Sequence, residues 1–226
     1  MKLRIALAAA ALCTFAVPVA IEAQTCTGSA SFSAGNMRLG ATGSFTDGAK
    51  TLGGAFTVGA TQGLFASVAV SQISYNDLSG TSSVIGGSVG YSAKVGSAAE
   101  FCPIASYSHA SFPKQSFFGG TITSGEDEFG LGGSFGIVSV MTPNLSLKPF
   151  VSAEYLHSTV NEHDSTLGSS STNYDYGLLG VGLGLIVDKS LTIVPGIAQP
   201  VGLKGAKIAF NVAVAVNFGH FGAPAK

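Results

Sequence analysis

The C-terminal segment constrains the fold of this chain most strongly. From Ile208 to Phe218, large apolar residues occupy every second position, and small or polar residues fill the positions between them. Successive side chains of a β-strand point to opposite faces, so one face of this segment is apolar and the other suits water or a packed lumen. The alternation is typical of a strand that crosses a membrane as part of a β-barrel.

The N-terminus has the pattern of a secretory signal peptide over residues 1–23. Lys2 and Arg4 form a short basic region, the run from Ile5 to Ala20 is almost entirely apolar, and Ala23 offers a small residue before a cut at Gln24. A retained transmembrane helix is the weaker interpretation, because the apolar run is short and polar chain follows at once. Cleavage leaves about 200 residues, enough for one domain.

Composition narrows the class of protein further. Charged residues are 10% of the chain and glycines number 31, yet no later segment supplies a helix-length apolar run. Such a chain is either an unusually apolar soluble β protein or a membrane barrel. Without the signal peptide, nine basic and eleven acidic residues remain, and no basic stripe indicates nucleic acid as a partner.

The rest of the chain repeats the theme of an alternating segment followed by a turn. Short turns alternate with longer polar loops around Asp47 and at 76–83, 111–126, 161–172 and 200–206, as in barrels with periplasmic turns and outer loops. We expect ten strands, and because the first and ninth are weakly patterned, eight is the alternative. The expected strands are 36–46, 51–61, 64–75, 82–95, 99–110, 127–140, 145–160, 173–187, 190–199 and 207–218.

The two faces of these segments indicate a membrane barrel rather than a soluble one. In 82–95, 127–140 and 173–187, bulky residues share one side and glycine or serine lies opposite. A lipocalin-like soluble barrel shows the reverse, with a bulky interior and a charged exterior. We therefore predict an all-β fold, an antiparallel up-and-down transmembrane β-barrel over residues 36–218, with the bulky face toward lipid and the small face toward the lumen.

The chain resembles small bacterial outer-membrane β-barrel proteins of the OmpA/OmpX-like superfamily. The resemblance covers essentially all of the mature chain and rests on the signal peptide, on turn-strand phrases such as 142–150, and on the terminal strand. It implies export to the cell outer membrane of a Gram-negative-type envelope, contact with its lipid and lipopolysaccharide, and insertion by the barrel-assembly machinery. Many relatives end on the terminal aromatic, whereas here the tail 219–226 follows Phe218.

Two cysteines remain once Cys13 leaves with the signal peptide. An even pair, Cys26 and Cys102, in an exported protein favours a disulfide, with two free thiols as the alternative. Cys102 opens the fifth expected strand at its periplasmic end, and Cys26 precedes the first strand on the same side. Because the lumen face is mostly small, we hypothesise that the bridge pins residues 24–35, an N-terminal periplasmic segment or plug, under or inside the barrel.

His109 and Ser111 share one face near the outer end of the fifth strand, and Glu126 or Glu128 begins the neighbouring strand. This resembles the His-x-Ser and glutamate arrangement of lipid A 3-O-deacylases, which implies a serine nucleophile with a histidine base. The surrounding residues do not match the motif of that family. We favour a solvated rim and expect no catalytic residue.

Other polar residues suggest no specific chemistry. His157, Glu162, His163 and Asp164 have no fixed spacing, so a solvated loop is favoured over a metal site, and the acidic run 126–128 is favoured as solvated over a cation site that bridges lipopolysaccharide. Inward Lys94, Lys148 and Glu154 are expected to form ion pairs in the lumen, and tyrosines are expected at the membrane interfaces. No cofactor or metal is expected.

These observations favour a structural or surface-interaction role with the outer loops as the working surface. The first alternative is a narrow channel or a carrier for a small molecule, although eight to ten strands enclose little lumen. An outer-leaflet lipid hydrolase is the third. The superfamily holds adhesins, channels and a few enzymes, so architecture alone does not decide between them, and the oligomeric state stays open.

Overall fold

The computed structural model describes residues 26, 28–29, 36–60, 63–76, 80–117, 120–165 and 168–220. The predicted signal peptide 1–23, most of the predicted plug 24–35 and the tail from residue 221 lie outside the described residues. Within the described part of the chain, no helix is long and apolar enough to cross a membrane.

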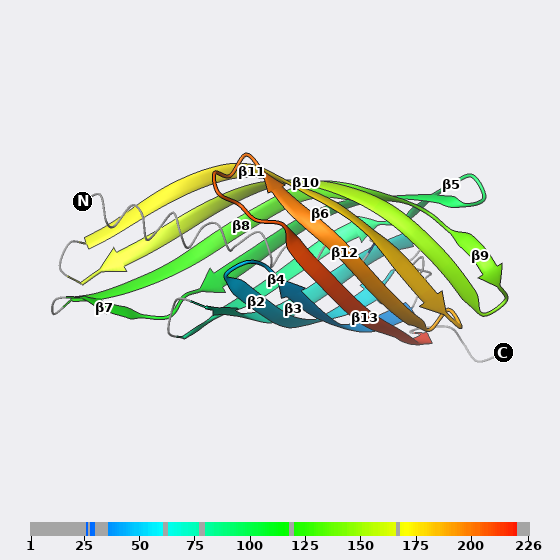
Figure 1. Cartoon of the computed structure of the whole chain (residues 1–226), viewed down its shortest axis with the longest axis horizontal. Coiled ribbons are helices and arrows are strands. Elements are labelled where there is room, and N and C mark those ends of the chain that lie inside the picture. Colours follow the sequence, from blue (N-terminus) through cyan, green and yellow to red (C-terminus); the bar gives the residue numbers. More distant parts are fainter. Residues whose placement is uncertain are drawn as a thin grey trace.

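Ten long strands close into an antiparallel barrel (Figure 1). Each pairs with its neighbours in chain order, and the pairing of β1 with β13 closes the ring. The count confirms ten strands rather than eight. The strands are β1 (Asn36–Phe45), β2 (Ala49–Gly59), β3 (Leu64–Tyr75), β4 (Thr81–Tyr91), β6 (Ala99–Ser111), β8 (Gly120–Ile137), β10 (Leu145–Asp164), β11 (Gly168–Val187), β12 (Leu191–Val201) and β13 (Ala209–His220).

Three short strands continue the ladder past the ends of longer ones. β5 (Ala93–Val95) pairs with β6 beyond the end of β4, and β9 (Ser139–Thr142) pairs with β10 beyond the end of β8. β7 (Gln115–Phe117) pairs with β8 at the opposite end of the barrel. Figure 1 shows β5 and β9 at one end and β7 at the other.

One end of the barrel carries a sheet extension. β8 has 18 residues and β10 and β11 have 20 each, whereas about 9–11 residues suffice for a strand to cross a bilayer. The extra length continues past β7 toward the β10–β11 hairpin at the left of Figure 1. The predicted loops 111–126 and 161–172 are therefore wrong in part, because β8 begins at Gly120, β10 runs to Asp164 and β11 begins at Gly168.

The extension identifies the outer end of the barrel, since outer-membrane barrels have short periplasmic turns and longer outer segments. The opposite end has tight connections, among them the β11–β12 turn, where Asp188 and Lys189 both have positive φ values. The chain therefore enters β1 and leaves β13 at the periplasmic end.

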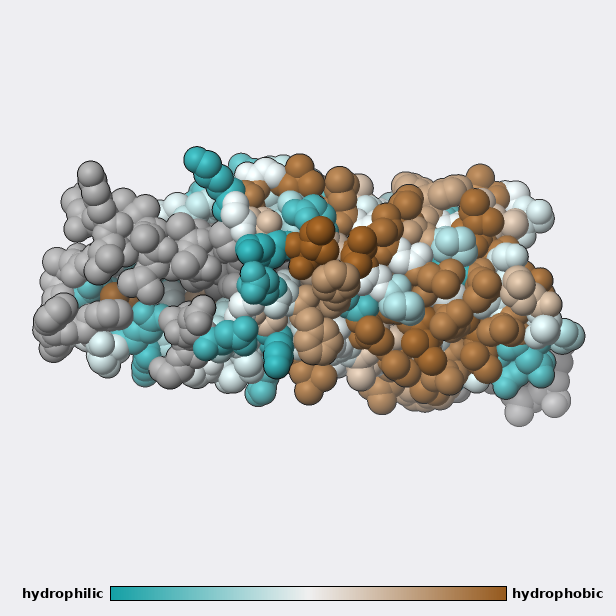
Figure 2. All heavy atoms as spheres, viewed as in Figure 1, coloured by the Kyte–Doolittle hydropathy of each residue, from teal (hydrophilic) through white to brown (hydrophobic). Residues whose placement is uncertain are grey.

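The outer surface of the barrel is apolar, as the alternation predicts. In β13 and just before it, side chains from Ile208 to Phe218 at every second position are 41–62% exposed, whereas Ala209, Asn211 and Ala213 are at most 7% exposed. On the face that Figure 2 shows, brown apolar residues form a broad band over the barrel wall, with hydrophilic residues gathered on the side of the extension. This band is the lipid-facing surface.

The lumen is lined by buried polar side chains, most of them serine or threonine, together with bulkier residues that the sequence analysis did not expect. Phe65 packs with Ile104 near the periplasmic half, and Leu156 packs with Tyr176 further out. A third cluster contains Ile73. The lumen face is therefore mostly small, as the sequence predicts, but a few side chains of full size share the interior with the small ones.

Candidate functional site

A disulfide joins Cys26 to Cys102 inside the barrel, the pairing that the sequence predicts. The two Cα atoms lie 6.0 Å apart, and both residues are buried, at 5% and 2% exposure. Cys102 lies on the inward face of β6, and the bridge packs against Phe65 and Ile104. The covalent tie therefore holds Cys26 within the lumen rather than below it.

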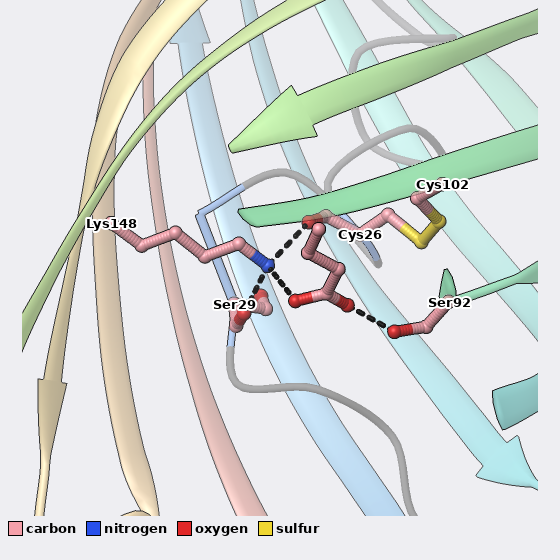
Figure 3. Close-up of polar contacts among 6 residues, drawn as sticks. Cys26, Ser29, Ser92, Cys102 and Lys148 are labelled. Atoms are coloured by element: carbon pink, nitrogen blue, oxygen red, sulfur yellow. Dashed lines mark hydrogen bonds and ion pairs between the residues drawn. A yellow bond between two sulfur atoms is a disulfide. The ribbon is translucent and has the colours of Figure 1, made fainter. Parts of the chain in front are cut away.

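Lys148 of β10 makes the second tie to this segment (Figure 3). Its ammonium donates to the backbone carbonyl oxygens of Ser29 at 2.9 Å and Cys26 at 3.4 Å, and it pairs with the Glu100 carboxylate at 2.6 Å. Glu100 also accepts a hydrogen bond from the Ser92 hydroxyl. Lys148 and Glu100 are 2% and 4% exposed. Buried charges require such pairing, because an unpaired one would be costly.

Gly28 lies directly against the barrel wall between these two ties. Its φ of +67° suits glycine, and a Cβ there would approach the Phe150 ring to 2.9 Å. On the facing strand β11, a Cβ at Gly184 would overlap the Gly28 carbonyl oxygen. The two glycines therefore allow backbone to meet backbone at this contact. We refer to Cys26, Gly28 and Ser29, with their contacts, as the lumen anchor.

The sequence analysis identified only part of the charged lumen. Lys148 and Glu154 point inward as predicted, but Lys148 pairs with Glu100, and Glu154 accepts from Ser106 at 2.9 Å. Lys94 of β5 lies opposite Glu100 in the strand register and so shares its inward face, but it is exposed at the end of the barrel, and no ion pair of Lys94 is found among the described contacts. Glu100 was missed, although it shares the inward face of β6 with Cys102.

A second inward residue escaped the sequence analysis. Arg38 of β1 is 4% exposed and donates from Nε to the Asn217 carboxamide of β13 at 2.7 Å. The contact crosses the seam where the first and last strands close the barrel. The alternation places Arg38 on the small-residue face of β1, and this pattern could have predicted that its side chain points into the lumen.

The outer rim carries two similar clusters that face outward. In the first, Tyr107 and His109 of β6 both contact Oδ1 of Asp127 on β8, at 2.7 and 2.9 Å. In the second, Tyr155 and His157 of β10 make the same contacts with Oδ1 of Asp175 on β11. Tyr107 and Tyr155 are about half exposed, at 52% and 53%, as expected of interfacial tyrosines. Tyr176 instead points into the lumen.

The acidic partner of His109 differs from the predicted ones. Glu126 and Glu128 are 4% and 5% exposed and point into the lumen, where they accept hydrogen bonds from Ser158 and Tyr176. Asp127, between them, faces outward beyond the apolar rows. Its Oδ1 accepts a hydrogen bond from the Tyr107 hydroxyl and lies 2.9 Å from His109 Nδ1.

The residues weighed as a metal site lie in a strand rather than in a loop. His157 pairs with Asp175, and the His163 imidazole contacts the Ser169 hydroxyl at 3.0 Å across the β10–β11 hairpin. Glu162 and Asp164 belong to the same strand β10. In the described part of the chain, no group of three or more histidine, cysteine, aspartate or glutamate side chains could hold a metal ion.

Comparison with solved structures finds outer-membrane β-barrels. The translocator domain of the autotransporter NalP from Neisseria meningitidis aligns with a TM-score of 0.53 over 82% of this chain and 87% of that chain, at 16% identity. The N-terminal barrel domain of OprF from Pseudomonas aeruginosa aligns at 0.41 and 13% identity, over 83% of this chain and 100% of that chain. Ail, the attachment invasion locus protein of Yersinia pestis, aligns at 0.40 and 11% identity, over 82% and 99%.

No protein-family model matches the chain, and no curated protein matches it either. At 16% identity, the likeness to the NalP domain shows the fold alone. That fold is a closed antiparallel β-barrel of the kind found in outer-membrane proteins, so the architecture that the sequence predicts is confirmed.

Proposed function

We propose that the protein has a structural or surface-interaction role, with the outer sheet extension and outer loops as its working surface. One observation carries the proposal: the lumen anchor, held by the Cys26–Cys102 disulfide and by Lys148, occupies the periplasmic half of the lumen. A barrel of ten strands encloses little free space. With chain anchored in that space, the surface outside the barrel is what remains to meet partners such as outer-leaflet lipopolysaccharide.

Transport is the alternative that this arrangement disfavours. A conducting pore needs a continuous hydrated path, whereas here the Lys148–Glu100 pair is buried against backbone and Phe65 is 1% exposed beside the disulfide. The polar lumen wall is consistent with a carrier only if the lumen anchor moves away. The extension of β8, β10 and β11 favours the surface role, since a channel does not require it.

Planar-bilayer recording of the purified, oxidised protein tests the proposal. Once insertion is verified, we expect no channel conductance across the bilayer. A general porin reconstituted in the same way is the positive control. Discrete openings by the oxidised protein would show that ions pass the lumen anchor. That result would overturn the surface role as the main function and favour the channel.

A further inference from the structure

Three side chains at the outer rim share an arrangement that a surface role does not require. The register of β6 and β8 places His109 opposite Asp127 and Ser111 opposite Gly125, and these residues face outward. His109 Nδ1 lies 2.9 Å from Asp127 Oδ1, and His109 Nε2 lies 3.4 Å from Ser111 Oγ. The order carboxylate, imidazole, hydroxyl is the connectivity of serine hydrolases.

Each contact has a defined chemical consequence. When Nδ1–H donates to the Asp127 carboxylate, Nε2 carries the lone pair and can accept the Ser111 proton. The 3.4 Å separation between Oγ and Nε2 exceeds the roughly 2.6–3.2 Å of a closed nucleophile–base pair, as is common in the absence of substrate. A small change in the χ1 angle of the exposed Ser111 side chain would bring Oγ closer to Nε2.

Two further side chains position Asp127. The Tyr107 hydroxyl donates to Oδ1 at 2.7 Å, and the Asn161 carboxamide donates to Oδ2 at 3.4 Å. Both carboxylate oxygens are therefore held, which fixes the orientation of the carboxylate toward His109. Asn161 also lines the same surface cleft as His109 and Ser111, a cleft of about 580 Å³.

The second rim cluster provides an internal comparison. Tyr155, His157 and Asp175 repeat the first three groups, but Thr159 occupies the place of Ser111. Among the described contacts, no hydrogen bond joins the Thr159 hydroxyl to His157. The tyrosine, histidine and aspartate are therefore common to both clusters, and only the first adds a hydroxyl to the imidazole.

The position of Ser111 indicates the substrate. Ile85 of β4 pairs with His109 and is 60% exposed in the apolar band, and Phe129 of β8 is 46% exposed one row below Asp127. Ser111 lies two residues further out on β6, about 7 Å along the strand. The interfacial layer beyond the hydrocarbon is about 5–7 Å thick on each side. Because barrel strands tilt by about 35–45°, this distance along the strand corresponds to about 5 Å of depth, so Ser111 lies within the interfacial layer, on the surface that faces the lipid.

We propose that Ser111 and His109 are catalytic residues, positioned by Asp127, that hydrolyse acyl esters of outer-leaflet lipids. Ser111 Oγ attacks the acyl carbonyl carbon as its proton passes to His109 Nε2. The tetrahedral oxyanion then collapses, the ester C–O bond breaks, and the lipid alcohol leaves with the proton from His109. Water attacks the acyl-serine with His109 as base, releasing the fatty acid and restoring Ser111.

Fatty acid release from vesicles tests the proposal. The oxidised protein is reconstituted in phosphatidylethanolamine with or without lipopolysaccharide, and mass spectrometry identifies the released acids, whose chain type shows which lipid supplies the ester. A fluorophosphonate probe reports the nucleophile independently of substrate. We expect release, and one probe adduct on the tryptic peptide that contains Ser111.

The variants assign a role to each side chain. Ser111→Ala should abolish the adduct and release. His109→Gln should lower kcat by about 10³-fold or more, and Asp127→Asn should lower kcat by about 10²–10⁴-fold with little change in KM. Ser83→Ala, opposite Ser111 on β4, and Thr159→Ala in the second cluster should match the wild type.

Folding of each variant is checked first by its compact mobility in unheated SDS gels. Wild-type release at an unchanged rate in folded Ser111→Ala would overturn the proposal. So would the absence of both release and adduct from the folded wild type in both vesicle types. Neither result bears on the lumen anchor, so the surface role proposed above stands or falls separately, by conductance.

Discussion

At the scale of single residues, the lumen anchor depends on backbone contacts that only glycine permits. Gly28 and Gly184 come from segments far apart in the sequence, yet their backbones meet inside the barrel. The sequence presented Gly184 as one of several small residues on the lumen face of β11. Nothing in the alternation distinguished it from Gly180 or Gly182, because the need for glycine comes from a contact made only in the folded barrel.

Gly184→Ala should therefore weaken the lumen anchor. A methyl group there overlaps the Gly28 carbonyl oxygen, and overpacking of this kind typically costs about 1–3 kcal/mol. The urea midpoint in lipid vesicles should fall, and the fraction of molecules with the Cys26–Cys102 bridge should drop in non-reducing mass spectra. Gly40→Ala is the matched control on the inward face of β1, since its Cβ meets nothing closer than 3.6 Å. If the two variants had equal urea midpoints and equal fractions of bridged molecules, the close contact between Gly28 and Gly184 would be contradicted.

The candidate site was only partly visible in the sequence for a similar reason. The cysteine count and the signal peptide sufficed to predict Cys26 with Cys102, and the spacing of His109 and Ser111 placed them on one face. Asp127 was missed as the partner because only Glu126 and Glu128 were considered, and these point inward. The pairing of His109 with Asp127 depends on the β6–β8 register, which the sequence does not specify.

At the scale of elements, alternation predicted the membrane-crossing strands well and the extension poorly. Predicted strand 64–75 matches β3, and the predicted start of β10 at residue 145 is also observed. Residues 161–172 read as a loop because they are polar on both faces. That polarity has a physical cause: beyond the bilayer, neither face of a strand must be apolar. The strand pattern therefore disappears where the lipid ends, although the ladder from Val160 with Thr172 to Asp164 with Gly168 continues.

Shortening the β10–β11 hairpin should remove part of the outer sheet extension without affecting the folding of the barrel. Replacing residues 162–170 by Asn-Gly joins Asn161 to Ser171, which already pair, through a turn suited to a two-residue hairpin. We expect compact mobility in unheated SDS gels and a urea midpoint near that of the wild type, because the apolar band is untouched. The control replaces only 165–167 with Asn-Gly. Loss of folding in the shortened variant alone would show that the extension belongs to the scaffold.

At the scale of the whole molecule, two independent ties hold the lumen anchor inside the barrel. The disulfide connects it to β6, and the Lys148 ammonium connects it to β10 across the interior. A covalent bond limits how far Cys26 can move but does not orient Ser29. The ammonium orients both carbonyl oxygens but can exchange with water. Each tie therefore supplies what the other lacks, and removal of one leaves the segment held by the other.

This redundancy predicts a non-additive effect on conductance. Cys102→Ser and Lys148→Met should each leave planar bilayers quiet, because one tie still holds residues 26–29 in the lumen. The double variant should show discrete openings, since it loses both ties and leaves a lumen wall rich in serine, threonine and glycine. Lys207→Met is the matched control, because it removes an exposed pair with Asp47 at 2.8 Å in the outer loops, away from the lumen. A quiet double variant that inserts normally would mean that side chains such as Phe65 and Leu156 close the lumen by themselves, whereas openings in either single variant would show that its tie alone controls closure.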